Sequence, residues 1–351
     1  MVDNENKNIQ NAIEFYMLAN RLKYATTDKK QSLADQVYGS MILATAINSE
    51  YNVVNEYNLG TALRMILFGT MAEIFYDEMR NCLSRMNFFG LTSTVETFEY
   101  FSHYKWDVGN FAFNCTTLEH QMNYFFEEFL DEENIKNDNV EELYNIAKNQ
   151  GITDSFGNDE NKNFEIFRFY YLNRVLKQKV RSGWDSKHWN ISNKRIERIS
   201  EHCVGTIALA IALRSEFEFN INLDKVISTL CIHEVGEIQI GDITPFDDIT
   251  PEQKEKIEHE AIIEVIGNLS NKDNIINSIF EFDKKETNEA KFAHYCDKLE
   301  ADIQAKIYYD LGLHHSLDKQ ENNVAKNANF LDFNFINYTS ELIKLALLLL
   351  L

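Results

Sequence analysis

The chain has few of the residues that interrupt helices, with only 2 prolines and 13 glycines among 351 residues. Its apolar residues recur mostly at spacings of three and four, which is the period of a helix with one buried face. The apolar fraction of 44% and the aromatic fraction of 13% exclude a disordered chain. We therefore predict an all-α protein that is long enough for two domains.

Positive charge is also scarce, because 34 lysines and arginines face 55 aspartates and glutamates, for a net charge of -21. A surface of this kind has no basic stripe to replace the counterions of a long polyanion. This excludes duplex nucleic acid as a favoured partner. A small anion, such as a nucleotide, stays compatible with the sequence if a metal ion or a local arginine neutralises it.

Cysteine is sparse as well, and the 5 residues are scattered without a CxxC motif. We expect buried, reduced thiols in a cytoplasmic protein. The N-terminus is polar and lacks the apolar core of a signal peptide. The apolar run at residues 342–351 is shorter than the roughly 20 residues that span a bilayer. We expect that run to be a buried or partner-facing helix, and we predict no membrane partner.

Three blocks of sequence recur in the same order, which predicts an internal duplication. The matching blocks are Phe15–Lys23 with Phe169–Lys177, the segment from Ala34 with the segment from Ser200, and the segment from Phe111 with the segment from Phe292. We predict a first copy at 10–135 and a second at 164–345. The polar stretch 136–163 is expected to be a solvated, partly helical linker.

Comparison of the two copies isolates four residues. The first copy keeps the apolar framework, and it keeps Glu73 opposite Glu237, but it lacks two histidines and two carboxylates. The residues that differ are His202 opposite Gln36, His233 opposite Gly69, Glu234 opposite Thr70 and Asp297 opposite Thr116. If packing alone required these groups, we would expect similar groups in the first copy.

The same four residues form a suitable set of ligands for a divalent metal. All of them lie in apolar segments that read as helices, where an isolated charge is very costly. Nitrogen and oxygen donors together suit Mn, Fe, Co, Ni or Zn, and Mg less well. Four protein ligands leave room for water on a six-coordinate metal, and such a metal generates a nucleophile near neutral pH.

Two acids follow the second histidine closely. Glu237 lies four residues after His233, so a continuous helix would place both on one face, where Glu237 could orient or deprotonate the attacking water. A structural role for Glu237 stays open, since Glu73 is its counterpart. Asp242 comes just after Gly241, where we expect the helix to end, and an ordinary loop aspartate is the alternative there.

The segment before His202 supplies candidate substrate contacts. Arg181 can form paired hydrogen bonds with a phosphate, and Trp184 can pack against a sugar or base. An exposed arginine beside an anchoring tryptophan is the alternative. Lys177 and Lys179 are expected on a solvated face. His294 is either a spare ligand or a packing residue.

The order His202, His233–Glu234, Asp297 resembles the H…HD…D signature of the HD-domain phosphohydrolases. The wider context is similar to the YfbR-like 5′-deoxynucleotidase branch of that superfamily, and the resemblance covers about 165–310. The segments that carry it are RSGW from residue 181, ISEH from 199, HEVGEIQIGDITP from 233, KIEHEA at 256–261 and TNEAKFAHYCDKLEADIQA from 287.

The resemblance implies a compact all-α fold and hydrolysis of the 5′-phosphate of deoxyribonucleoside monophosphates. It implies ligand roles for the four residues named above, a role for Glu237 and Asp242 at the water and leaving group, and a role for Arg181 and Trp184 at the phosphate and sugar. Glu234 stands where the signature has aspartate. Its side chain is one methylene longer, so we expect a shifted metal or a different carboxylate geometry.

Members of this family are commonly homodimers, so the tandem copies suggest two helical bundles packed as a pseudo-dimer within one chain; further oligomerisation stays open. Two other functions also stay open. The same site could act on nucleoside triphosphates or signalling nucleotides, or the chain could be a non-catalytic nucleotide-binding protein.

Overall fold

The computed structural model describes residues 2–25, 31–87, 107–129, 139–185, 196–242 and 250–310. Within these ranges the named elements are all helices, and the one recorded β pairing is an isolated antiparallel bridge between Val180 and Arg198. The predicted all-α class is therefore confirmed. The apolar run at 342–351 lies outside the described residues.

We call residues 2–129 the first half and residues 160–310 the second half. The helices of the first half are α1 (Val2–Asn20), the 3₁₀ turn η1 (Arg21–Lys23), α2 (Leu33–Tyr51), α3 (Glu56–Leu83) and α5 (Asp107–Phe129). Between the halves lie α6 (Val140–Asn149) and η2 (Ile152–Ser155).

The second half begins with α7 and repeats the order of the first. Its helices are α7 (Glu160–Asn173), η3 (Arg174–Lys177), α8 (Ser182–Asp185), α9 (Ile199–Glu216), α10 (Leu223–Ile232), α11 (Glu237–Ile240), α12 (Pro251–Ile266), α13 (Lys272–Lys284) and α14 (Asn288–Asp310). The repeated sequence blocks thus fall on α1 and α7, on α2 and α9, and on α5 and α14. This correspondence supports the predicted duplication, which stays a prediction.

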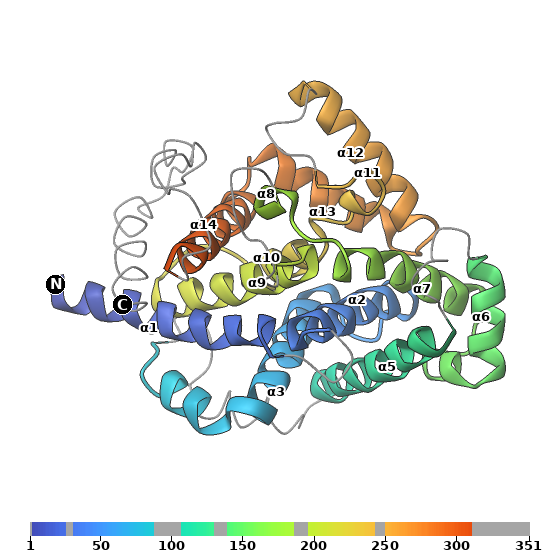
Figure 1. Cartoon of the computed structure of the whole chain (residues 1–351), viewed down its shortest axis with the longest axis horizontal. Coiled ribbons are helices and arrows are strands. Elements are labelled where there is room, and N and C mark those ends of the chain that lie inside the picture. The colour runs from blue at the N-terminus through green and yellow to red at the C-terminus, as the bar shows by residue number, and fades with distance from the viewer. Residues whose placement is uncertain are drawn as a thin grey trace.

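Helix α9 lies at the centre of the molecule. It packs against α1 and α2 of the first half and against α10 and α14 of the second (Figure 1). Nearly all of its residues are buried, as expected of a helix that is apolar on every side. The buried side chains of both halves join into one continuous hydrophobic core.

Local capping signals explain where several helices start. Ser32 and Asp35 form a reciprocal capping box at the start of α2, and Thr250 and Gln253 form another at the start of α12. Helix α12 also carries Pro251 in its first turn, where the missing N–H costs nothing. These short-range hydrogen bonds fix the helix boundaries before tertiary packing is considered.

The segment between the halves is more packed than the solvated linker that we expected. Helix α6 buries Leu143, Tyr144 and Ala147, and the Tyr144 ring meets the rings of Phe164 and Phe167 edge to face. Polar residues cover the outer side of α6. They obscure the amphipathic pattern of this helix in the sequence. The segment therefore docks onto α7.

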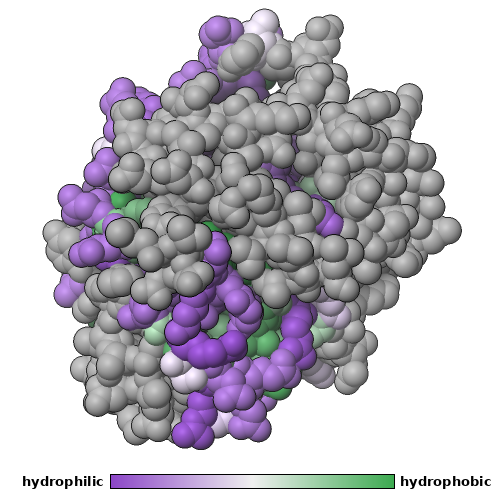
Figure 2. Space-filling model, turned by 90° about the vertical axis from the view of Figure 1, so that its left-hand side faces the viewer, coloured by the Kyte–Doolittle hydropathy of each residue, from purple (hydrophilic) through white to green (hydrophobic). Residues whose placement is uncertain are grey.

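One helix is apolar and long enough to resemble a membrane span. Residues 59–83 of α3 meet that test by length and composition, but 67% of the apolar window is buried inside the protein. This is the pattern of a core helix. In the side view of Figure 2, the described residues at the surface are mostly hydrophilic, and hydrophobic atoms show only in small areas between them. All five cysteines are buried and free of disulfides, as predicted.

Candidate functional site

His202 lies in the first turn of α9 and is completely buried. Its Nδ1 atom is 2.5 Å from Oε2 of Glu300, and its Nε2 atom is 3.0 Å from Oδ1 of Asp297. Both acids are on α14, which packs along α9. The ring is thus held between two carboxylates, with one nitrogen directed toward each.

His233 and Glu234 do not lie within a continuous helix, which corrects our expectation. Helix α10 ends at Ile232, residues 233–236 form a turn, and Glu237 begins the short helix α11. The turn is held by hydrogen bonds from the Val235 N–H to the Ile232 carbonyl oxygen and from the Glu237 N–H to the Glu234 carbonyl oxygen, over 3.1 and 3.0 Å. Such bonds span three residues, as in a 3₁₀ helix, so a tighter turn replaces the α-helix between His233 and Glu237. The expected α-helical face shared by these two residues is thus interrupted.

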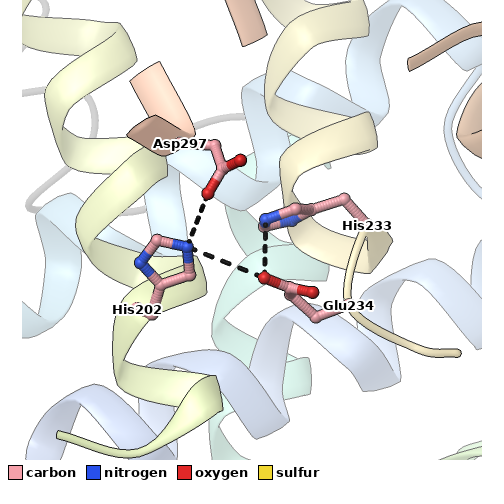
Figure 3. A group of neighbouring side chains, drawn as sticks. All are labelled: His202, His233, Glu234 and Asp297. Carbon is pink, nitrogen blue, oxygen red and sulfur yellow. Dashed lines mark hydrogen bonds and ion pairs between the residues drawn. The ribbon is translucent and has the colours of Figure 1, made fainter. Parts of the chain in front are cut away.

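The four predicted ligands nevertheless converge from three segments (Figure 3). Oε1 of Glu234 is 3.4 Å from Nε2 of His233 and 3.7 Å from Nε2 of His202. One ligand atom from each of His202, His233, Glu234 and Asp297 lies within 4.8 Å of the others. The sequence comparison therefore selected side chains that meet in space although they are up to 95 residues apart.

The donor set fits a divalent metal. Nδ1 of His233 is 2.9 Å from the carbonyl oxygen of Leu230, which leaves Nε2 directed toward Glu234. That Nε2 atom is buried and has no hydrogen-bond partner among the described residues. A buried polar atom without a partner is costly, and a metal at the centre of the four ligands would satisfy it.

Neighbouring charges lower the pKa of both predicted carboxylate ligands. Burial alone raises the pKa of Asp297, but the Lys298 ammonium and the His202 ring lower it well below its usual range. Burial likewise raises the pKa of Glu234, and the two histidines lower it on balance. Both groups are therefore anionic near neutral pH, as cation ligands must be.

Glu237 lies close to this cluster, and its pKa is shifted in the opposite direction, upward. Burial raises its pKa, and the carboxylates of Glu234 and Asp242 raise it further. A hydrogen bond with Glu234 adds to the effect. A carboxyl group with a raised pKa can exchange a proton near neutral pH. Glu237 is half-buried, whereas its first-half counterpart, Glu73, is exposed, so the shared fold alone does not account for the burial of Glu237.

Asp242 lies just beyond the end of α11, as predicted. Gly241 ends that helix with φ at +82°, a conformation that glycine adopts without strain. Oδ2 of Asp242 accepts a hydrogen bond of 2.6 Å from the backbone N–H of Ser182. Asp242 therefore connects the end of α11 to the loop that carries Arg181.

Arg181 is directed toward the acids of the site. Burial lowers its pKa, but Glu197, Asp242, Glu234 and Asp297 raise it above the ordinary value on balance. Its Nη1 atom is buried and has no hydrogen-bond partner within the described part of the chain. A buried guanidinium nitrogen that lacks a partner can accept an anionic ligand group, and phosphate matches it.

Trp184 packs in a small apolar cluster beside the site. Its ring meets Tyr308 edge to face, and its Nε1–H donates to Oε2 of Glu197 over 2.8 Å. The described contacts of Trp184 thus anchor the loop. Contact with a sugar stays a prediction. Nδ1 of His294 lies 3.8 Å from Oδ2 of Asp297, and His294 is not one of the four clustered residues.

The sequence reasoning missed the residues behind His202. Glu300 contacts the ring directly, and Lys23 of the first half forms ion pairs of 2.5 Å with both Glu300 and Glu197. Lys177, which we expected on a solvated face, is also buried and pairs with Glu119 at 2.6 Å. The repeated blocks could have revealed these residues. Lys23 matches Lys177, and Glu119 matches Glu300, so each half has the same lysine and the same glutamate.

Lys179, the other lysine expected on a solvated face, is half-buried, and its ammonium group contacts the backbone of α11. Its Nζ atom donates to the carbonyl oxygens of Glu237 and Ile238, over 2.7 and 3.3 Å. Burial lowers its pKa. Lys179 therefore holds the end of the broken helix close to η3.

Comparisons with known proteins identify the family of the second half. The family model described as HD domain matches residues 174–333. The chain is 31% identical over 149 residues to 5′-deoxynucleotidase HDDC2 of Dictyostelium discoideum, across 40% of this chain and 75% of that protein. It is 29% identical over 150 residues to the Mus musculus protein of the same name, across 42% and 71%, and 28% identical to that of Homo sapiens, across 42% and 69%. The chain belongs to the HD-domain 5′-deoxynucleotidase family.

Proposed function

We propose that this protein removes the 5′-phosphate from deoxyribonucleoside or ribonucleoside monophosphates with the help of a divalent metal. The observation that carries the proposal is the convergence of four ligand atoms around the unpartnered Nε2 of His233. Membership of the family makes the chain a hydrolase of nucleotide phosphate esters. The curated relatives are named as 5′-deoxynucleotidases, which supports a monophosphate as the substrate.

His202, His233, Glu234 and Asp297 would hold the metal. When bound, a divalent ion polarises the phosphoryl oxygens and makes water a nucleophile at neutral pH. Mn, Co, Fe and Mg all stay candidates. The nitrogen donors favour the first three, because Mg prefers an oxygen shell.

Glu237 and Asp242 would handle the protons of the reaction. The raised pKa of Glu237 allows its carboxyl group to orient water and to accept or return a proton. Asp242 accepts a hydrogen bond from the backbone of Ser182 and interacts electrostatically with Arg181, and we propose that it serves the leaving oxygen. These two roles separate the acid–base groups from the ligands.

Arg181 would bind the phosphate. Its unpartnered Nη1 provides a charged donor, and the surrounding acids keep the guanidinium in place until an anion arrives. Trp184 fixes the loop through Glu197, and we propose that Trp184 also contacts the sugar. Arg181 also explains how a protein with net charge -21 can accept an anion.

Phosphate release from a nucleotide panel tests the proposal. Purified protein would be stripped of metal, loaded with Mn²⁺ or Co²⁺, and given deoxyribo- and ribonucleoside mono- and triphosphates and a cyclic nucleotide. Release of inorganic phosphate from the monophosphates supports the proposal. Release of pyrophosphate or triphosphate would favour the alternative substrate class, and tight nucleotide binding without turnover would favour the non-catalytic function.

A further inference from the structure

The first helices of the two halves are exchanged. Helix α1 of the first half packs along α9 of the second, and α7 of the second half packs along α2 of the first (Figure 1). The hydrogen bonds at the far ends match: Asn8 donates to the carbonyl oxygen of Glu216, and Lys162 donates to the carbonyl oxygen of Glu50. In the aligned repeats, each donor and each acceptor occupies a corresponding position. Neither half therefore completes its own bundle.

Each exchanged helix delivers a tyrosine to a buried glutamate, and the 3₁₀ turn after it delivers a lysine. In what we call the site cluster, Lys23 pairs with Glu300 at 2.5 Å and the Tyr16 hydroxyl donates to Glu300 over 2.9 Å. In the mirror cluster, Lys177 pairs with Glu119 at 2.6 Å and the Tyr170 hydroxyl donates to Glu119 over 2.5 Å. All these side chains are nearly inaccessible to solvent.

A glycine on the opposing helix makes room for each glutamate. A Cβ atom on Gly39 would collide with the Glu119 carboxylate, and one on Gly205 would collide with that of Glu300. The same device occurs twice, so the cluster itself belongs to the scaffold. What differs between the halves is the group on the far side of each glutamate.

Only the site cluster continues to a metal ligand. Oε1 of Glu300 receives Lys23 and Tyr16, and Oε2 is 2.5 Å from Nδ1 of His202. In the first half, the position of His202 is occupied by Gln36. A carboxylate on one imidazole nitrogen fixes the orientation of the ring and presents the other nitrogen to a metal.

Lys23 is also connected to the loop that carries Arg181 and Trp184. Its second partner, Glu197, accepts the Trp184 indole N–H through its side chain, and its backbone carbonyl accepts the N–H of Arg181 over 3.0 Å. The ammonium group of Lys23 thus contacts both Glu300, which lies behind His202, and Glu197, which holds the loop of Arg181.

We propose that the first half completes the active site, with Lys23, Tyr16 and Glu300 as positioning residues for His202. None of the three touches the reacting atoms. Lys23 and Tyr16 hold Glu300 in one orientation, and Glu300 aligns the His202 ring with the other three ligands. The proposal rests on the proposed function only in assuming that these four residues bind a metal.

The mirror cluster supplies a matched control. Lys23→Met and Lys177→Met each remove one buried ammonium group that pairs with glutamate, and each lysine lies in the 3₁₀ turn after an exchanged helix. We expect both variants of the full-length chain to lose comparable thermal stability. Only Lys23→Met should weaken Co²⁺ binding, by about 10–100-fold, which is the usual loss when a partner behind a metal ligand is removed.

Titration of the metal-free full-length protein with Co²⁺, followed by calorimetry and by the visible absorption of the bound ion, measures this difference without turnover. Equal Co²⁺ affinity in Lys23→Met and Lys177→Met would overturn the proposal, whether both match the unaltered chain or both are weakened alike. Lys23→Arg keeps the charge and should recover part of the affinity.

Tyr16→Phe and Tyr170→Phe form a milder pair in case the methionine variants do not fold. Removal of one hydroxyl should lower Co²⁺ affinity in Tyr16→Phe by a few-fold and leave it unchanged in Tyr170→Phe; identical affinities would contradict the proposal. An unaltered chain that binds no Co²⁺ overturns this proposal and the proposed function together. One that binds Co²⁺ without hydrolysing any nucleotide overturns the proposed function alone.

Discussion

The two halves of the molecule share a scaffold and differ in chemistry. Both place a buried Lys–Tyr–Glu cluster beneath a central helix, and both keep the glycine that admits the glutamate. Among the described residues, the groups able to hold a metal all lie in the second half. The first half therefore keeps the shared scaffold without the four predicted ligands.

The clearest structural difference is a break in one helix. Helix α3 runs without interruption through Gly69 and Thr70, and its one non-helical residue is Phe75. In the second half, the matching helix α10 ends at Ile232, and the next helix, α11, begins at Glu237. The counterpart hydroxyls of Thr70 and Thr116 donate back to their own helix backbone. The two halves thus differ at these positions in backbone as well as in side chains.

Removal of a ligand should separate the halves most strongly. His202→Ala should abolish tight metal binding and lower kcat/KM by on the order of 10⁴ or more, the scale expected when a central catalytic group is deleted. Gln36→Ala, at the matching position, should leave both quantities unchanged. Metal content and phosphate release measure the two effects. A His202→Ala protein with normal metal content would contradict the ligand assignment.

A smaller loss is expected for the proposed acid–base group. Glu237→Gln keeps the size of the side chain but cannot exchange a proton, so kcat should fall by about 10²–10⁴. Metal affinity should stay within a few-fold of the unaltered value. Glu73→Gln is the control, because Glu73 is exposed. If Glu237→Gln leaves kcat unchanged, as Glu73→Gln should, then Glu237 has a structural role only.

Glu234→Asp should have a modest effect, because it restores the residue of the family signature and keeps the charge. Shortening the side chain by one methylene should change kcat by about tenfold or less, which equals about 1.4 kcal/mol, and should alter the order of preference among Mn²⁺, Co²⁺ and Mg²⁺. Activity measured with each ion checks this. A loss as large as that of His202→Ala would show that the longer carboxylate is essential to this site.

Much of the site was accessible from the sequence, since comparison of the repeats selected four residues that do converge. Residue types and spacing cannot show a break inside an apolar segment, so the turn at 233–236 was missed. They also do not show burial of a lysine. Lys177 reads as a surface residue because its partner, Glu119, is 58 positions earlier in the chain. Exchange of α1 and α7 is a long-range packing choice that no local pattern encodes.

A graft tests whether side chains alone distinguish the halves. Gln36→His, Gly69→His, Thr70→Glu and Thr116→Asp together would give the first half all four ligand types. We expect the variant to bind one Co²⁺ per chain, like the unaltered protein, because α3 stays a regular helix at residues 69 and 70, whereas the second half has a tighter turn at the matching positions. Calorimetric stoichiometry with a check of cooperative unfolding measures this. Two ions per chain would show that the break between α10 and α11 is dispensable, and that side-chain loss alone separated the two halves.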